Sequence, residues 1–478
     1  MIAHSQQAEP KPILYRLTRA VVKVAMTVFF RKIELRHGKY VPERGPVVFV
    51  ANHPNSVMDA LVMGVVTRRK VNYVGHAGLF SNKLKSWFLR STGVIPVYRR
   101  EDAPDKMGQN VAMFEACYQA LENGETIGIF PEGTSDMVRK VKKVKTGAAR
   151  MVLEAERRNG YKLGLTLLPV GLYFFSRSRF RSRVLVNVGV PIKLSDFFEM
   201  NEEDNVAAVQ ALTAEIQRNL QKTTVNIEHE ELDTFVRDIE HLYREELQAE
   251  TFGSNKTSRA TVAEFFLTQK IADCVEHFYR VEREKVQRIQ DNLATYKRKL
   301  SRLHLKDAML KEKATFAELL KRSVASFAPA VVGAPLALYG IINNIIPYSL
   351  TEFLVKKTVD DRTKILLTLL FGGTGIFVVF YTLQFLFIAF LTSKIFALIY
   401  ILSVPLVGLF ALNYLKMVQE QRERISLFFF LFSKPQMLEK IRNERDTLIS
   451  QLNQVRDEYL AIWSSRAQPP GDSGTSAE

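Results

Sequence analysis

Residues 47–59, VVFVANHPNSVMD, decide how this chain is expected to fold. The apolar, mostly β-branched residues that open the stretch predict a buried strand, and Asn55 or Ser56 can cap a helix that follows it. His53 then lies in the turn, and Asp59 lies in the helix. A carboxylate that holds one ring nitrogen of His53 leaves the other nitrogen able to remove a hydroxyl proton. Taken alone, the pair is more simply explained as a histidine satisfied inside a loop.

The alternation of short β-rich runs with helical stretches continues to about residue 220. The predicted strands are residues 47–51, 72–75, 94–98, 126–130, 165–171 and 183–190, and helices are predicted at residues 107–123 and 147–158. This alternation is typical of α/β domains. The expected fold is a mixed sheet flanked by helices over residues 32–220, followed by a helical region and a C-terminal membrane hairpin.

Polar residues follow two of the predicted strands. Arg99 ends the run GVIPVYRR, and a guanidinium binds phosphate through two parallel hydrogen bonds. Glu132, Gly133, Thr134 and Ser135 follow the strand that ends in Ile129-Phe130-Pro131. A carboxylate, a glycine and two hydroxyls in such a turn can bind a polar ligand. The simpler explanations are a strand exit with solvated charges and a tight turn.

Two further positions are candidates for ligand binding. Lys145 opens the predicted helix with Thr146 and Gly147, where it could hold a phosphate or belong to a simple helix cap. Pro169 lies inside a late strand, where proline is costly and needs a local reason. That reason could be the lining of an acyl site, or an edge position or bulge.

The order and spacing of these blocks resemble those of the glycerolipid acyltransferases, the glycerol-3-phosphate and lysophosphatidate acyltransferases, over about residues 30–220. The resemblance implies a general base, His53, oriented by Asp59. It implies binding of glycerol phosphate by Arg99, Glu132, Gly133 and Thr134, with Ser135 and Lys145 as further candidates, and it places Pro169 at the acyl-donor site. No metal or organic cofactor is expected.

One departure from the common family pattern narrows the resemblance. Five residues, not four, separate His53 from Asp59, as in the branch that contains eukaryotic-type glycerol-3-phosphate and dihydroxyacetone-phosphate acyltransferases. The apolar C-terminal region, with PLALYGIINNIIPY, resembles the same branch. The expected activity is transfer of a fatty acyl chain from acyl-CoA or acyl-carrier protein to glycerol-3-phosphate or a lysophosphatidate-type acceptor. The alternatives are a phospholipid transacylase and a non-catalytic lipid-binding scaffold.

The charge and composition of the chain are those expected of a protein that acts at a membrane surface. The 478 residues carry a formal net charge of +16, which suits an anionic membrane surface or anionic substrates. No nucleic-acid-binding motif is present, so nucleic acid is not expected as a partner. Cys117 and Cys274 form no CxxC pair, and GxSxG, HExxH, P-loop and GxGxxG patterns are missing from the sequence.

Hydropathy divides the rest of the chain into segments. Residues 1–31 predict an interfacial helix, residues 221–322 amphipathic helices, residues 416–465 another amphipathic helix, and residues 466–478 a disordered tail. Within the membrane region, residues 323–415, we expect a spanning hairpin of residues 365–393 and 395–415 that turns near Lys394.

The residues that flank the apolar segments predict their topology. Basic residues precede and follow the hairpin, so both of its ends are expected on the cytoplasmic face, together with the catalytic domain. Residues 323–350 also have basic residues at both ends and contain three prolines, which favours an in-plane or re-entrant segment. The sequence therefore predicts an integral protein of a bacterial inner membrane or an organelle membrane.

Overall fold

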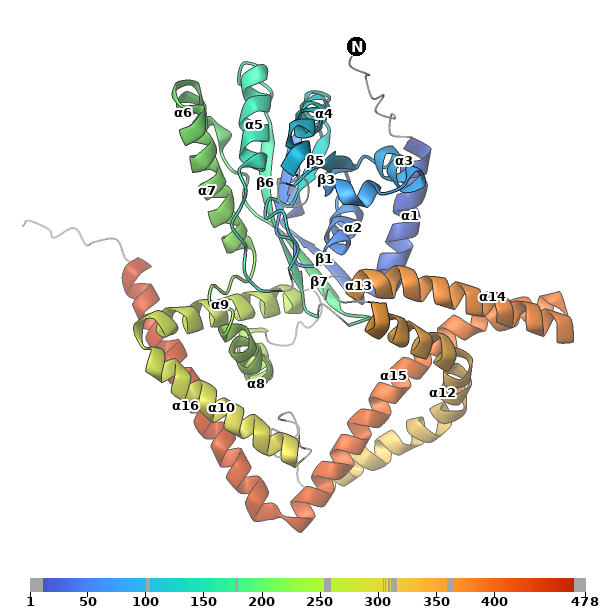
Figure 1. The fold of residues 1–478 in the computed structure, drawn as a ribbon. Helices are drawn as coiled ribbons and strands as arrows, with labels where there is room; N and C mark the ends of the chain where they lie inside the picture. The colour runs from blue at the N-terminus through green and yellow to red at the C-terminus, as the bar shows by residue number, and fades with distance from the viewer. Residues whose placement is uncertain are drawn as a thin grey trace, which may run out of the picture. The chain divides into compact units, whose positions relative to one another are not determined.

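The computed structural model describes residues 12–99, 104–136, 138–176, 179–252, 259–303, 305, 307, 310, 316–358 and 365–467 (Figure 1). The chain divides into two compact units. The first unit consists of Met1–Glu230, Phe252–Gln269 and Val355–Gly372, and the second of Glu231–Thr251, Lys270–Leu354 and Gly373–Glu478. Most of the predicted disordered tail lies outside the described residues.

One mixed sheet organises the first unit. Its described strands are β1 (Lys32–Arg36), β2 (Val47–Ala51), β3 (Val71–His76), β4 (Ile95–Val97), β5 (Thr126–Ile129), β6 (Thr166–Phe174) and β7 (Arg183–Val188), in the spatial order β1-β7-β6-β2-β5-β3-β4. All neighbours are parallel except β6 and β7, which are antiparallel. This confirms the α/β fold class expected from the sequence.

Helices cover both faces of the sheet (Figure 1). In this unit they are α1 (Pro12–Phe29), α2 (Val57–Val66), α3 (Lys83–Ser91), α4 (Asn110–Glu122), α5 (Gly147–Arg158), α6 (Phe198–Glu203) and α7 (Asn205–Thr223). Short 3₁₀ turns are η1 (Gly38–Tyr40), η2 (Ala77–Phe80), η3 (Pro104–Gln109) and η4 (Leu194–Phe197).

Strand β2 lies between two hydrophobic cores because its side chains alternate between the faces of the sheet. Val48 and Val50 pack into the core formed with α4, α5 and α7. Val47, Phe49 and Ala51 pack into the core formed with α1 and α2. Burial on both faces explains why the strand reads as an unbroken apolar run.

The strand boundaries differ from the prediction where local pattern is weak. Strand β1, with the sequence KIELR, was not predicted, because its three charged residues leave too few apolar residues for a strand pattern. It is a short edge strand that pairs with β7. Strand β6 runs three residues further than predicted, to Phe174, in an apolar stretch without a turn signal.

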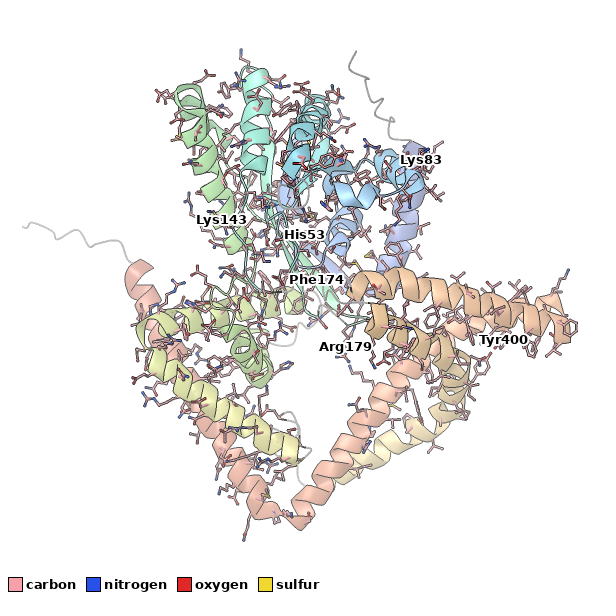
Figure 2. The ribbon with its side chains drawn as sticks, viewed as in Figure 1. His53, Lys83, Lys143, Phe174, Arg179 and Tyr400 are labelled. Carbon is pink, nitrogen blue, oxygen red and sulfur yellow. The ribbon has the colours of Figure 1, made fainter. Side chains whose placement is uncertain are left out.

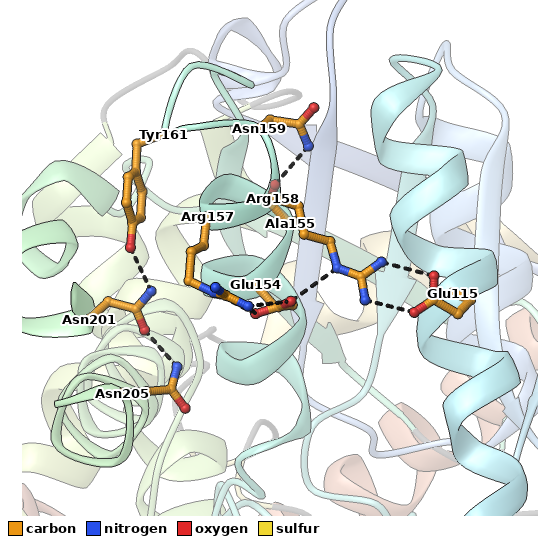
Figure 3. A network of polar contacts seen from close by, with 9 residues as sticks. All are labelled: Glu115, Glu154, Ala155, Arg157, Arg158, Asn159, Tyr161, Asn201 and Asn205. Carbon is orange, nitrogen blue, oxygen red and sulfur yellow. Dashed lines mark hydrogen bonds and ion pairs between the residues drawn. The ribbon is translucent and has the colours of Figure 1, made fainter. Parts of the chain in front are cut away.

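Ion pairs join the helices on the outer side of one core (Figure 3). Arg158 of α5 makes two hydrogen bonds of 2.7 and 2.8 Å to the carboxylate of Glu115 on α4. It also contacts Glu154 within α5 at 3.0 Å. These charges are solvated, so the pairs orient the two helices more than they stabilise them.

The later described helices lie mostly in the second unit, although residues 259–269 and 355–358 belong to the first. They are α8 (Leu232–Phe252), α9 (Arg259–Val281), α10 (Arg283–Arg302), α12 (Phe316–Thr358), α14 (Thr374–Leu391), α15 (Lys394–Ser433) and α16 (Pro435–Ala467). Where one amphipathic helix was expected over residues 416–465, α15 continues to Ser433 and Pro435 opens α16. Proline is well suited to a first helical position. Lys299 of α10 pairs with Glu444 of α16 at 2.7 Å.

Three described helices are long and apolar enough to cross a membrane: Pro329–Lys357, Leu369–Leu391 and Lys394–Gln419. The helical chain breaks between Leu391 and Lys394, where the hairpin was predicted to turn. Residues 323–350 lie inside the continuous helix α12, prolines included. Membrane crossing and topology stay predictions.

Polar side chains join these three helices. The Tyr381 hydroxyl of α14 donates to Asn344 Oδ1 of α12 at 2.7 Å, and Asn344 Nδ2 donates to the Val404 carbonyl of α15 at 3.3 Å. Gln384 of α14 donates to the carbonyl of Asn343 at 3.1 Å. Hydrogen bonds between helices are a common means of association for apolar helices, so α12, α14 and α15 pack as one group.

Candidate active site

The strand–turn–helix unit of residues 47–66 forms the centre of the site. Strand β2 ends at Ala51 and α2 begins at Val57, so His53 lies in the turn. His53 Nδ1 lies 2.9 Å from Asp59 Oδ2. The Asp59 side chain is fully buried, whereas the His53 side chain is 13% exposed. With Nδ1 donating to the carboxylate, Nε2 is the ring atom available as a base.

The turn is held by its own backbone. The amide of Asn55 donates to the same Asp59 oxygen at 2.8 Å, so this oxygen accepts two hydrogen bonds. Ser56 is the N-cap residue of α2, as predicted, but its side chain makes no cap bond. Its φ of 52° and ψ of −134° are unfavourable for a residue with a Cβ. The amide of Ser56 donates to Ser135 Oγ at 2.8 Å, which ties this strained residue to the turn after β5.

Parallel strands bring several predicted residues to one edge of the sheet. Strands β2, β5, β3 and β4 are parallel neighbours, so the residues that follow them lie at the same edge. His53 follows β2, Glu132 follows β5, and Arg99 follows β4. Figure 2 marks His53 among the strands of the first unit. Strands β5 and β3 lie between β2 and β4, which makes three inter-strand spacings of about 4.8 Å. Arg99 therefore lies about 14 Å along the edge from the end of β2.

Glu132 connects the turns at this edge. Its carboxylate accepts hydrogen bonds from the backbone amides of His53 at 3.2 Å and Lys142 at 3.3 Å. Burial raises the pKa of Glu132 to about 7, although both amides and the His53 ring favour the charged form. The resemblance assigned Glu132 to substrate. In the structure its two oxygens accept from backbone amides, one of them in the histidine turn, and its role in substrate binding stays a prediction.

Two residues that sequence reasoning missed orient this turn. The Phe130 ring stacks on the His53 ring, with centroids 4.1 Å apart and an angle of 15° between the planes. The Asn52 amide group bonds both backbone groups of Leu172 in β6, at 2.7 and 3.2 Å. This side chain extends the β2–β6 pairing past Ala51. Asn52 and Phe130 stand beside residues of the predicted motifs, and this was the only feature of the sequence that could have pointed to them.

Gly133 and Lys145 lie together. Gly133 has a φ of +73°, and a Cβ on it would lie 3.0 Å from Lys145 Cε and Nζ. The amide of Lys145 donates to the carbonyl of Pro131 at 2.9 Å, which closes the loop between β5 and α5. The Lys145 side chain is exposed, as is that of Thr134. The loop therefore presents a positive charge next to a turn that only glycine fits easily.

Pro169 lies within the sheet. It is the register partner of Val50 in β2, and its carbonyl accepts from the amide of Gly189 at 2.8 Å. The β6–β7 ladder begins one residue later, at Val170, so the proline lies just outside that ladder. Pro169 is buried and its ring faces Gly189. A role at the acyl-donor site stays a prediction.

Among the described residues, no cluster of three or more His, Cys, Asp or Glu side chains could hold a metal ion.

Comparison with known proteins shows which proteins this region of the chain is similar to. Residues 32–173 match the model of the Acyltransferase family. An uncharacterised acyltransferase of Schizosaccharomyces pombe is 22% identical over 373 residues, which are 60% of this chain and 54% of that protein. Glycerol-3-phosphate O-acyltransferase 1 of Saccharomyces cerevisiae is 27% identical over 212 residues, 44% of this chain and 26% of that protein. The chain thus spans about half or less of these relatives.

A solved structure shows a weaker likeness. The 1-acyl-sn-glycerophosphate acyltransferase PlsC of Thermotoga maritima is 18% identical, covers 44% of this chain and 80% of its own, and gives a TM-score of 0.32. The family match spans β1 to the end of β6, and therefore includes the His53 turn and the Glu132 turn. Residues 32–173 are thus similar to the Acyltransferase family, and one of the relatives named above is a glycerol-3-phosphate acyltransferase.

Proposed function

We propose that this chain is a membrane-bound O-acyltransferase that moves a fatty acyl chain from a thioester donor to the hydroxyl of glycerol-3-phosphate or a lysophosphatidate-type acceptor. The observation that carries the proposal is the His53–Asp59 pair. Its 2.9 Å contact, with Asp59 buried and His53 partly exposed, is the geometry of a general base.

The reaction needs no covalent enzyme intermediate. His53 Nε2 takes the proton of the acceptor hydroxyl while its oxygen attacks the thioester carbonyl, and a tetrahedral oxyanion forms. The C–S bond then breaks, the ester remains, and the thiolate leaves with the proton that the imidazolium returns. The buried Asp59 carboxylate stabilises the imidazolium in between.

Basic residues at the site support an anionic acceptor. Lys145 stands beside Gly133, and Lys142 and Lys143 lie in the same loop. Lys142 is paired with Asp136 at 2.8 Å, and the Lys145 side chain is exposed beside Gly133, where it would contact a bound phosphate. The likeness to a glycerol-3-phosphate acyltransferase supports that acceptor, and the distant Arg99 suits a larger anionic group such as the donor's phosphates.

The test is thiol release by the detergent-solubilised chain. Palmitoyl-CoA is supplied with glycerol-3-phosphate, dihydroxyacetone phosphate or lysophosphatidate, and the wild type is compared with His53→Ala. A matched control is His241→Ala, which removes an exposed histidine of α8. Acceptor-dependent release that is lost in His53→Ala and kept in His241→Ala supports the proposal.

The design also separates the alternatives. Acyl transfer from a phospholipid with no thioester present, dependent on His53, indicates a transacylase. No transfer from acyl-CoA, acyl-carrier protein or phospholipid to any of the three acceptors would overturn the catalytic proposal and leave a lipid-binding scaffold.

A further inference from the structure

A surface of the first unit, formed by η2 and α3, exposes large apolar side chains. Leu79 is 40% exposed, Leu84 74%, Trp87 45% and Phe88 38%. In α3, Leu84, Trp87 and Phe88 lie within an arc of about 100° of the helix, because residues advance by about 100° each. We call these three residues, together with Leu79 of η2, the α3 face. Exposed apolar side chains in one patch indicate a contact with another apolar phase.

Positive charge borders the α3 face. Lys83 and Lys85 are both exposed and lie on opposite flanks of the apolar arc. Residues 60–100 contain eight lysines or arginines and no aspartate or glutamate. This part of the chain therefore carries a strong positive field without an internal counter-charge, and anionic surfaces are its natural complement.

An open groove adjoins the same surface. It has a volume of about 690 Å³ and runs between Phe80 and Trp87, with Lys83 and Arg90 among its lining residues. The Arg90 guanidinium lies 5.4 Å from the centre of the Phe80 ring. His53, Asp59 and Glu132 are not among the residues that line this groove, so the groove is separate from the site described above.

The first unit also contains the start of an apolar helix long enough to cross a membrane. Leu370, in the π-helical turn η6 (Leu369–Gly373) after α13 (Ile365–Thr368), is 5% exposed and belongs to the hydrophobic core that includes Met58 and Val62 of α2. The candidate span Leu369–Leu391 therefore begins in the hydrophobic core of the catalytic unit.

We propose that the α3 face is a membrane-docking surface of the catalytic unit, in which Leu79, Leu84, Trp87 and Phe88 enter the headgroup–acyl boundary and Lys83 and Lys85 pair with anionic lipid headgroups. Apolar residues flanked by lysines, with a tryptophan, have the composition of an interfacial contact. An acidic protein would complement the charge but not an apolar face of this size, so a membrane is the better match.

The position of the face gives the docking a consequence for catalysis. Turn η2 starts directly after His76, the last residue of β3, at the sheet edge where His53 lies. A bilayer in contact with η2 and α3 would therefore adjoin the edge that holds the base. This inference rests on the membrane-bound state in the proposed function, but it does not need acyl transfer to be correct.

Fluorescence of Trp87 tests the proposal in the full chain. The chain has two tryptophans, so Trp463→Phe leaves Trp87 as the only emitter. This variant is reconstituted in vesicles of phosphatidylglycerol or phosphatidylcholine, with plain lipids or lipids brominated near the headgroup. We expect bromination to quench about half of the emission in the anionic vesicles and less in the neutral ones, since interfacial residues lie about 5–10 Å deep.

A charge variant and a catalytic variant complete the design. Lys83→Gln with Lys85→Gln should reduce quenching in anionic vesicles to the level of neutral vesicles. His53→Ala should leave quenching unchanged, so loss of activity and loss of docking are distinguishable. Emission that is equal with plain and brominated lipids would overturn the proposal. Quenching in anionic vesicles that is unchanged by Lys83→Gln with Lys85→Gln would also overturn it. So would a blue shift that requires added acyl-carrier protein and occurs without lipid quenching.

Discussion

Replacement of Asp59 by Asn tests the arrangement at the centre of the site. Asn has the size of Asp and keeps an oxygen that can accept from the amide of Asn55, so the turn should persist. What is lost is the negative charge that faces the His53 imidazolium. At a charge separation of about 4 Å and an effective dielectric constant of about 20, that charge contributes about 4 kcal/mol. The expected loss in kcat/KM is therefore about a thousandfold.

The assay is acceptor-dependent thiol release, measured as kcat/KM for wild type and variant. The matched control is Asp196→Asn, the same chemical change at a carboxylate that is 55% exposed and pairs with Lys193 on the surface. It should stay within about threefold of wild type, because exposed ion pairs contribute little. An unfolding midpoint equal to that of wild type shows that Asp59→Asn is folded. A folded Asp59→Asn protein within tenfold of wild-type kcat/KM would refute the assignment of this pair as the catalytic base.

Three further predictions concern stability, each measured as an unfolding midpoint in detergent. Burial raises the pKa of Glu132 from its ordinary 4.5 to about 7, so the unfolded chain binds fewer protons between these values. Stability should therefore fall by up to about 3 kcal/mol as pH rises from 4.5 past 7, and Glu132→Gln should lack this slope; equal slopes would contradict it. Ser135→Ala removes the acceptor for the strained Ser56 amide and should cost about 1–2 kcal/mol. Adding Ser56→Gly should restore at least part of this loss, and no recovery would argue against strain. Leu370→Ala should cost about 2–4 kcal/mol because Leu370 is buried, whereas Phe371→Ala, at a side chain 58% exposed, should cost much less; equal losses would show that Leu370 is not part of the core.

Contacts between distant parts of the chain were beyond sequence reasoning. The stacking of Phe130 on His53, the hydrogen bond from the His53 amide to Glu132, and the bond from the Ser56 amide to Ser135 each join residues more than 70 positions apart. They depend on β2 and β5 being neighbours, and no local pattern encodes which strands pair.

The sequence by itself predicted the strand and helix around the central pair and the proximity of His53 to Asp59. Hydrophobic period and turn residues predicted β2 and α2, and the spacing of His53 and Asp59 placed both in one local unit, because interactions within a dozen residues follow from short-range geometry. Only the tertiary structure decided the strand order, the edge strand β1, the burial of Pro169 within the sheet and the entry of Leu370 into the core. Those features arise from packing between segments that are remote in sequence, where burial of apolar surface outweighs local preference.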